Sequence, residues 1–555
     1  MIKHLLCIFF IALSYSLFAQ QNTVGLLSHD PSKAYDGYNL IYPHNQPNVY
    51  LLDNCGRIVH TWEDEADFRP GNMAYLMPDG RLIKTKRPAA VAGNPIWAGG
   101  GGATVEIRTW DNELLWEFTI NNEEERLHHD IAITNEGNIL MIVWEVKTAD
   151  EAVQAGRDPE NLPDGELWPD YILEIKPLDN NEYEIVWEWH VWDHLVQDFD
   201  ATKDNFGIVE DHPELVDINY DTSNGADDWM HTNAIDYDPV NDMIMLSVPT
   251  FRELWIIDHT TSTEEAATSN GGLGGRGGDL LYRWGNPAAY KQGTEADQKL
   301  FYQHDTHWID DYLNATHPNY RKIGIFNNRV GADISTINVI DPGFDMYDWG
   351  FSFDGNVFGP AEFTWTASHP NPQANWSTGL SSVQFLPNGN ALVCVGRFGY
   401  TFELTPDNEI VWEYKTPLIS GQAANQGDTL SINNNLTFRV SRIPTDFEAF
   451  DGKDLQPKGY IENNPDSSFC GLLSSLDDMP MKDLRIYPNP TNDMVVVEWD
   501  GGYKIILEVY DMLGNRVKQI QTTGGRHFMD LKDLQSGMYY IRINNGELQK
   551  LIIQR

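Results

Sequence analysis

Three histidines in this sequence occupy the same place relative to a repeated hairpin. His129 lies eight residues before a turn glycine, and His231 and His304 take the matching positions in later copies of the repeat. Imidazole is a competent nucleophile near neutral pH, and it carries positive charge when protonated. Because equivalent positions of a closed repeat lie at one height, we expect the three rings to converge on one pocket.

A nearby arginine strengthens this expectation. Arg329 ends the strand that follows the His304 unit, and its planar guanidinium would offer two donors to the oxygens of an anion such as sulfate. Clustered imidazoles beside a guanidinium favour an anionic ligand. The alternative for each of these residues is a structural role, because a lone His is most often structural and an Arg often forms a surface ion pair. His307 lies close by in sequence and joins the candidate binding residues.

The hairpins that carry these histidines belong to a larger unit. Each unit has an apolar strand that ends near a Trp, followed by a hairpin whose tip is typically Asp-Gly, Glu-Gly or Asn-Gly. The six tryptophans are Trp62, Trp116, Trp187, Trp284, Trp365 and Trp412. Six such units predict an all-β protein with a six-bladed β-propeller over residues 22–450. A large β-sandwich is the alternative.

The composition limits the class of protein. The 555 residues include 38 basic and 82 acidic side chains, which gives a net charge of −44. A surface this acidic repels phosphate, so nucleic acid is excluded as a partner and an anionic membrane surface is disfavoured. With 41% hydrophobic residues, the chain has enough apolar material for a large core, which excludes wholesale disorder.

The first residues have the pattern of an export signal. A basic start is followed by an apolar run from Leu5 to Leu17 and by a small-residue exit near Ala19. We therefore expect residues 1–20 to be a cleaved secretory signal peptide, with a membrane anchor as the alternative. No other stretch has the length and apolar character of a transmembrane helix.

Cysteine usage predicts neither a disulfide framework nor a metal site. Removal of the signal leaves Cys55, Cys394 and Cys470, an odd number, and there is no Cys-x-x-Cys pair to hold zinc. One disulfide among these three is compatible with the sequence, but its pairing stays open.

The C-terminal part of the chain differs from the repeat. Residues 451–483 are polar and predict a linker, and residues 484–555 contain short alternating strands that predict a small β-sandwich. This tail resembles the C-terminal sorting domain of type IX secretion substrates, through Ile486 to Pro490, Val509 to Arg516, Gly537 to Arg542 and Lys550 to Arg555. The resemblance implies outer-membrane translocation by the type IX secretion machinery, removal of the tail, and release or surface attachment. An ordinary accessory sandwich is the alternative.

The main body resembles the arylsulfotransferase family of six-bladed propellers. The matching segments are Asp228 to Asp238, Leu280 to Pro287, Gln303 to Asp305 and Ile325 to Arg329. The resemblance implies transfer of a sulfuryl group from a phenolic sulfate ester to a phenol, without the nucleotide donor PAPS and without a cofactor. A family histidine takes the group covalently, and by motif match His231, His304 and Arg329 correspond to residues that bind the sulfate oxygens.

One departure from the family pattern concerns that nucleophile. The family places it in the last blade, where this chain reads Val393 to Phe402 and contains no His. Tyr400 stands there, and His369 would replace it only if the alignment shifted. A non-catalytic propeller that binds an anionic or aromatic ligand or a surface partner is therefore the alternative function. We assign no metal, and we assign His231, His304, Arg329 and His129 to catalysis and His307, Arg397 and Tyr400 to substrate binding.

Overall fold

The computed structural model describes residues 22–466, 470, 485–498, 505–512, 516–522, 526–543 and 549–555. The chain divides into two compact units between Pro465 and Asp466, within the predicted linker. The predicted signal peptide, residues 1–20, lies outside the described residues. In the described part of the chain, no helix is long and apolar enough to cross a membrane.

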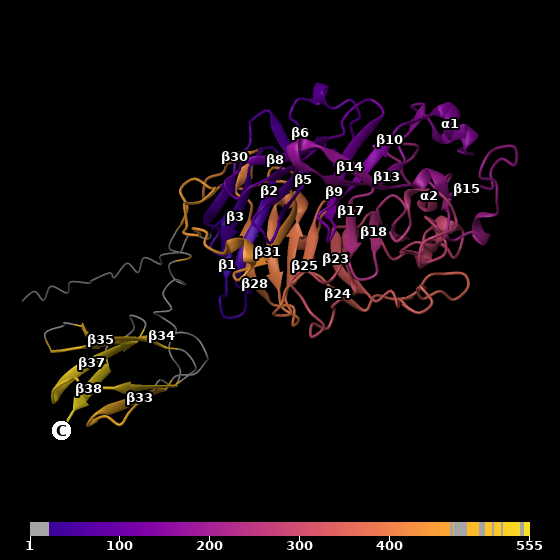
Figure 1. Cartoon of the computed structure of the whole chain (residues 1–555). Coiled ribbons are helices and arrows are strands. Elements are labelled where there is room, and N and C mark those ends of the chain that lie inside the picture. Colours follow the sequence, from indigo (N-terminus) through magenta and orange to yellow (C-terminus); the bar gives the residue numbers. More distant parts are fainter. Residues whose placement is uncertain are drawn as a thin grey trace, which may run out of the picture. The chain divides into compact units, whose positions relative to one another are not determined.

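Antiparallel sheets dominate the larger unit (Figure 1). Its described residues contain six sheets of four or five strands, and each sheet begins at an edge strand that we call its lead strand. In order, the lead strands are β31 (Thr437–Pro444), β5 (Phe68–Leu76), β9 (Glu125–Ile133), β17 (Ala234–Asp238), β21 (His304–Trp308) and β25 (Ser382–Phe385).

The other strands of each sheet follow outward from its lead strand. The first sheet adds β2 (Gly37–Pro43), β3 (Val49–Asp53) and β4 (Ile58–Trp62); the second β6 (Leu82–Pro88), β7 (Thr104–Arg108) and β8 (Leu114–Thr119); the third β10 (Ile139–Glu145), β13 (Asp170–Pro177) and β14 (Tyr183–His190). The fourth adds β18 (Met243–Val248), β19 (Glu253–Asp258) and β20 (Tyr282–Trp284); the fifth β22 (Ile323–Gly331), β23 (Ile334–Ile340) and β24 (Trp365–Ala367); the sixth β26 (Ala391–Val395), β27 (Tyr400–Leu404), β28 (Ile410–Lys415) and β1 (Gly25–His29).

The lead strands contact one another in a cyclic order. β5 contacts β31 and β9, β17 contacts β9 and β21, and β25 contacts β21 and β31. Both ends of the unit contribute to this closure, because β31 pairs with β2 in the first sheet and β1 pairs with β28 in the last. Residues at the same position of successive lead strands therefore lie near one another.

The tryptophans of the predicted repeat share one structural role. All six lie in the fourth strand of their sheets, and five indoles donate a hydrogen bond to a loop that adjoins a strand of the next sheet in the cycle. The bonds run from Trp62 to the Thr109 carbonyl, from Trp116 to the Glu182 carbonyl, from Trp187 to the Thr261 hydroxyl, from Trp284 to the Pro360 carbonyl and from Trp412 to the Asn54 carbonyl. The repeat thus encodes the contacts between sheets.

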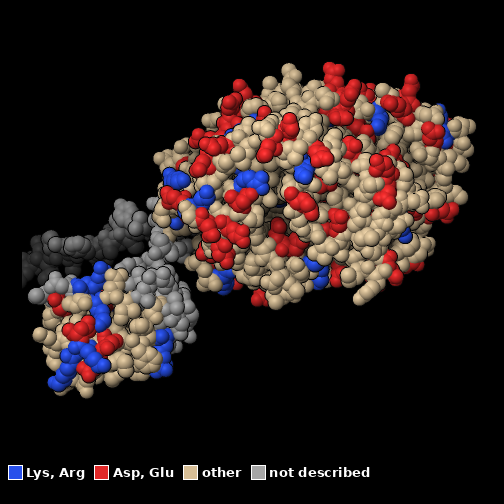
Figure 2. All heavy atoms as spheres, in the orientation of Figure 1, with Lys and Arg blue, Asp and Glu red and all other residues tan. Residues whose placement is uncertain are grey.

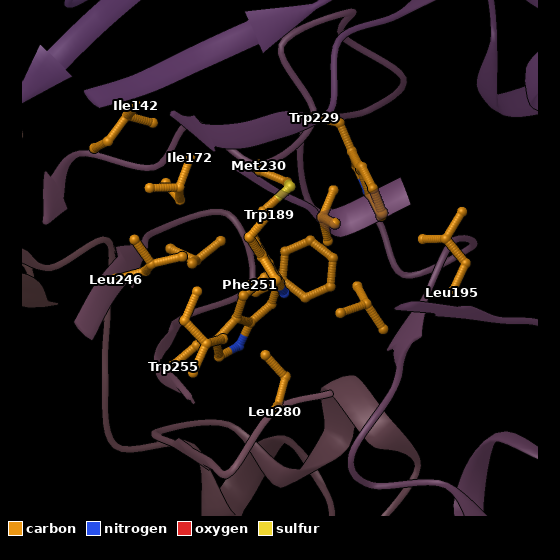
Figure 3. Packing of buried hydrophobic residues seen from close by; sticks show 14 of the residues in the cluster. Ile142, Ile172, Trp189, Leu195, Trp229, Met230, Leu246, Phe251, Trp255 and Leu280 are labelled. Atoms are coloured by element: carbon orange, nitrogen blue, oxygen red, sulfur yellow. The ribbon is translucent and has the colours of Figure 1, made fainter. Parts of the chain in front are cut away.

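The largest apolar cluster lies between the third and fourth sheets. Trp189, Trp229 and Trp255 lie near its centre, each at most 1% exposed (Figure 3). Burial of indoles removes a large apolar area from water and stabilises this region. Trp229 lies two residues before His231, so the cluster anchors the segment that carries this histidine.

Insertions lengthen the third and fourth repeat units. One contains β11 (Lys147–Thr148), α1 (Ala149–Gln154) and β12 (Glu166–Leu167), and others contain β15 (Leu195–Val196), β16 (Val216–Asp217) and α2 (Thr263–Ala266). Both short helices begin with a capping box, in which Thr148 and Ser262 exchange hydrogen bonds with a glutamate three residues later. A further strand pair is β29 (Leu418–Ile419) with β30 (Gln422–Ala423).

The smaller unit contains two antiparallel sheets in its described residues. One has the order β32 (Arg485–Tyr487), β33 (Met494–Glu498) and β36 (Arg526–Asp530), and the other has the order β35 (Arg516–Thr522), β34 (Ile505–Tyr510), β37 (Gly537–Ile543) and β38 (Gln549–Ile553). Alternate residues of these strands, including Val497, Val509 and Ile541, form one buried cluster.

The three cysteines beyond the signal fall into two classes. Cys55 and Cys470 are each disulfide-bonded, whereas Cys394 is a buried free thiol. Burial raises the pKa of the Cys394 thiol to about 12, which keeps it protonated and unreactive.

The acidic composition is visible on the surface of the larger unit. Figure 2 shows Asp and Glu side chains spread over the visible face, with Lys and Arg more sparsely placed among them. An anion-binding site in this protein therefore needs a local concentration of positive charge.

Candidate functional site

The structure brings the three predicted histidines together on or next to three consecutive lead strands. His129 lies in β9, His231 lies three residues before β17, and His304 is the first residue of β21. The ring centroids of His129 and His231 are 4.5 Å apart. Phe438 of β31 connects the set, at 6.3 Å from His129 and 6.4 Å from His304.

Local backbone geometry positions two of these side chains. His129 and His231 have φ angles of 51° and 55°, and Asn72 and Ser381, at the equivalent repeat position, have 102° and 92°. Left-handed backbone is uncommon for residues other than Gly. The pairing of β9 with β10 also shifts register around His129, as in a β-bulge, which redirects side chains. The shared conformation marks these positions as structurally equivalent.

Asp228 orients the ring of His231. Nδ1 of His231 donates a hydrogen bond to Oδ2 of Asp228 at 2.5 Å, and Nε1 of Trp144 donates to the other carboxylate oxygen at 2.9 Å. The remaining ring nitrogen of His231, Nε2, is the one left for a ligand, on a side chain that is 15% exposed. Burial opposes the charged ring, but the Asp228 carboxylate prevails and raises the pKa of His231.

A second carboxylate acts on the neighbouring histidines. Nε2 of His128 donates to Oδ1 of Asp170 at 3.1 Å, so Nδ1 of His128 is free to accept a hydrogen bond from Nδ1 of His129 at 2.8 Å. The His128 ring stacks on Trp144 with centroids 4.0 Å apart. Burial, reinforced by the charges of His231 and His128, lowers the pKa of His129 well below its usual value. His129 is therefore neutral at neutral pH.

A run of four glycines, from Gly99 to Gly102, packs against these rings. A Cβ at Gly100 would lie 2.0 Å from Nε2 of His129, so only Gly allows the loop to pass this close, and Gly100 covers that nitrogen. Nε of the buried Arg126 donates to the carbonyl of Gly102 at 2.8 Å and holds the loop in place.

His304 has both ring nitrogens occupied. Nδ1 donates to Oδ1 of Asn328 at 2.9 Å, and Nε2 accepts from the backbone N–H of Leu380 at 3.0 Å. Burial and the nearby charge of His231 lower the pKa of His304 to about 3, against the opposing effect of Asn328. This ring is therefore neutral at neutral pH.

Arg329 and Tyr302 form the other side of the site. The Arg329 guanidinium lies 3.7 Å from the centroid of the Tyr302 ring, which is 5.9 Å from the His231 ring. Nε of Arg329 donates to the carbonyl of Thr378 at 2.9 Å. The two terminal nitrogens make no hydrogen bond within the described residues and are the donors left for a ligand. A planar donor fork beside an aromatic ring suits an aromatic ester of an oxyanion.

Two more guanidinium groups add to the positive charge. Partial burial and the charges of Arg252 and Arg397 lower the pKa of Arg329. A Cβ at Gly379 would lie 3.4 Å from Nη2 of Arg397 and 3.8 Å from Cε1 of His304, so Arg397 borders the same site. Three close guanidinium groups repel one another, and a bound anion would relieve that repulsion.

Two of the residues that were predicted to bind substrate, His307 and Tyr400, make their contacts outside the histidine cluster. His307 lines a cavity of about 380 Å³ together with Asp236, Asp310 and Tyr312, and its Nδ1 bonds the carbonyl of Asp305 at 2.9 Å. Tyr400 donates its hydroxyl hydrogen to Glu413 at 2.6 Å.

Arg439 of β31 connects the lead strands next to the histidines. It forms ion pairs with Asp130 at 2.9 Å and Asp305 at 2.7 Å, and its Nη1 donates to the Tyr75 hydroxyl at 2.9 Å. Asp130 and Asp305 immediately follow His129 and His304 in sequence, so this network supports the backbone of the site. Within the described residues, no group of three or more His, Cys, Asp or Glu is arranged to hold a metal ion.

Several functional candidates were missed from the sequence, although some left a signal there. Asp228 lies three residues before His231, Tyr302 lies two residues before His304, and the glycine run from Gly99 is plain in the sequence. No local signal marks Phe438 or Trp144, because their contacts depend on which strands become neighbours.

Comparisons with solved structures give weak similarity. A Bacteroides caccae protein of unknown function is 10% identical, with 74% of this chain and 99% of that chain covered and a TM-score of 0.37. Virginiamycin B lyase from Staphylococcus aureus is 9% identical, with 67% of this chain and 94% of that chain covered and a TM-score of 0.30. At these TM-scores the likeness carries no information about activity. No curated protein matches the chain.

Family models give the decisive similarity. The model described as "Secretion system C-terminal sorting domain" matches residues 485–554, which indicates export by type IX secretion to the cell surface or the outside. The model described as "Arylsulfotransferase (ASST)" matches residues 26–431, a range that contains His129, His231, His304 and Arg329. The chain therefore belongs to the arylsulfotransferase family and carries a secretion-system sorting domain at its C-terminus.

Proposed function

We propose that this protein transfers a sulfuryl group from a phenolic sulfate ester to a phenol, without a nucleotide donor. The observation that carries the proposal is the convergence of His129, His231 and Arg329 beside the ring of Tyr302. Fixed donors and positive charge of this kind stabilise the charge that develops on a transferring oxyanion group. Membership of the arylsulfotransferase family supplies the reaction class.

The chemistry of the site suits both halves of the substrate. Arg329, Arg252 and Arg397 supply a positive field in a protein whose net charge of −44 would otherwise repel a sulfate ester. The rings of Tyr302 and Phe438 offer aromatic surfaces to a phenol. In this proposal His304 shapes the pocket, because its ring nitrogens already bond Asn328 and Leu380.

The architecture that we propose around this site is a six-bladed β-propeller over residues 22–450. The cyclic contacts of the lead strands and the tryptophan bonds between successive sheets support it. The same proposal assigns residues 1–20 to a signal peptide, residues 451–483 to a linker and residues 484–555 to a small β-sandwich that acts as the sorting domain.

The test is an assay of the purified protein with 4-nitrophenyl sulfate as donor and phenol as acceptor. Arg329→Gln should lower kcat/KM by about 10²–10³-fold, because one preorganised donor to the transition state is lost. Arg276→Gln is the matched control, since Arg276 is exposed in a glycine-rich loop outside the site, and it should leave transfer unchanged. Equal activity in both variants would contradict the proposal.

Binding without catalysis is the second candidate function. The observation that favours it is Tyr400, which stands where the family nucleophile is expected and is hydrogen-bonded to Glu413. In that case the protein would bind an aryl sulfate and leave it intact. Saturable binding of 4-nitrophenyl sulfate with no release of nitrophenol would identify this function.

A further inference from the structure

Only some histidines near the site have a ring nitrogen that a substrate could reach. Both nitrogens of His304 are bonded, to Asn328 and Leu380. Both nitrogens of His128 are bonded, to His129 and Asp170. A group whose two nitrogens are engaged would have to break a buried hydrogen bond before it could attack.

Three further histidines near the site differ in the same respect. Nε2 of His44 has no hydrogen bond in the described residues, but it is buried and substrate does not reach it. Nδ1 of His129 is bonded to His128, and Gly100 covers its Nε2. His369, near Tyr400, contacts Asn371 through Nδ1 and the Tyr400 hydroxyl through Nε2. His231 alone in this set combines a carboxylate at Nδ1, an Nε2 with no hydrogen bond in the described part of the chain, and an exposed edge.

We propose that Nε2 of His231 is the nucleophile that takes the sulfuryl group, with Asp228 as the residue that positions its ring. This inference rests on the proposed function. It assigns to His231 the role of the nucleophilic histidine, which is missing from the last blade. Its geometry is that of an activated nucleophile, in which a third group fixes the ring and leaves one nitrogen free to attack.

The proposed reaction has two balanced steps. In the first, the Nε2 lone pair of His231 forms a bond to sulfur while the bond from sulfur to the donor oxygen breaks, and the donor leaves as a phenolate that takes a proton from water. In the second, the acceptor phenol releases its proton to water and its oxygen attacks sulfur. The bond from sulfur to Nε2 then breaks, and its electron pair returns to the ring.

Asp228 has a clear role in the intermediate. With Nδ1 still protonated, the sulfonated ring of His231 carries a positive charge, which the adjacent carboxylate compensates at 2.5 Å. The hydrogen bond from Trp144 holds that carboxylate in place, so no rearrangement is needed when the charge appears.

The test is a search for the covalent intermediate. The purified protein is incubated with 4-nitrophenyl sulfate without an acceptor, and the adduct is located by peptide mass spectrometry at neutral pH. We expect one sulfuryl group on the peptide that contains His231, and its loss on addition of phenol. His231→Gln should abolish the adduct and lower transfer more than about 10³-fold.

Two further variants separate a chemical role from a structural one. His212→Gln is the matched control, because Nδ1 of His212 also bonds a carboxylate, that of Glu214 at 2.9 Å, but on an exposed ring outside the site. It should retain the adduct. In His231→Gly, added imidazole should restore nitrophenol release, because the free base occupies the vacated position.

The outcomes distinguish this inference from the proposed function. Transfer by the native protein with the adduct on another residue, or with a His231→Gln variant as active as the native protein, would overturn the role of His231 and leave the function intact. Absence of both transfer and adduct in the native protein would overturn the two together.

Discussion

The indole nitrogen of Trp412 donates a hydrogen bond to the carbonyl of Asn54 at 2.7 Å, and this bond joins the last sheet of the larger unit to the first. Trp412 is 1% exposed, and the guanidinium of Arg442 lies 4.4 Å from its ring centroid. The residues are 358 positions apart in sequence, so their contact exists only when the cycle of sheets is complete.

Trp412→Phe should therefore lower the free energy of unfolding by about 1–3 kcal/mol, because it leaves the Asn54 carbonyl without its donor. Trp365→Phe is the control, since the Trp365 indole is only partly buried and makes no hydrogen bond within the described residues. It should cost less than about 1 kcal/mol. Denaturant unfolding of both variants measures the difference, and equal losses would contradict a special role for the closing contact.

Gly100 and Gly137 provide a matched pair for the glycine loop. Both have left-handed φ angles, of 80° and 82°, but a Cβ would meet the His129 ring at Gly100 and nothing within 4 Å at Gly137. Gly137→Ala should cost about 1–2 kcal/mol for its backbone conformation. Gly100→Ala should add about 1–3 kcal/mol from overpacking and also lower transfer. Thermal unfolding together with the transfer assay would detect this, and identical behaviour of the two variants would contradict the loop contact.

The pH dependence of transfer should report the charge state of His231. Asp228, Asp170, Arg329, His129 and Tyr302 face this ring, and the raised pKa of His231 means that the ring loses its proton above its usual value of 6.5. Only the unprotonated ring attacks, so transfer should rise with pH through that pKa.

Asp228→Asn tests this assignment directly. The variant removes the charge that stabilises the protonated ring, so the rising limb should move to lower pH while the maximum rate falls. A pH–rate profile of the two proteins provides the measurement. A limb that stays in place would show that another group controls it.

The C-terminal strand should control export. β38 pairs with β37, and Arg555 forms an ion pair with Asp493 at 2.8 Å, so the last residues are part of the folded sorting domain. Deletion of residues 550–555 should leave the protein in the periplasm, because the sorting domain no longer completes its sheet. Fractionation of cells and medium measures this, and unchanged delivery would refute the sorting role.

The features that recur at regular spacing along the chain could be predicted from the sequence. The Trp positions and the hairpin spacing placed six sheets in order, and the same spacing marked His129, His231 and His304 as residues that lie near one another. These signals are local, because a turn glycine and an alternating strand specify their own geometry.

Other features depend on geometry that the sequence does not display. His307 follows His304 by three residues, and the register shift of β21 against β22 lies between them, so His307 lines the cavity beside Asp310 instead of the histidine cluster. Phe438 enters the site from β31, which joins the first sheet from the far end of the unit. Sequence reasoning had no means of placing such a distant strand.

The central claim is tested most directly by the ratio of products. With 4-nitrophenyl sulfate and phenol, the account predicts one phenyl sulfate formed for each nitrophenol released, in the absence of any nucleotide, and little release without phenol after the first turnover. Release of nitrophenol with free sulfate as the product, or no release at any phenol concentration, would contradict it.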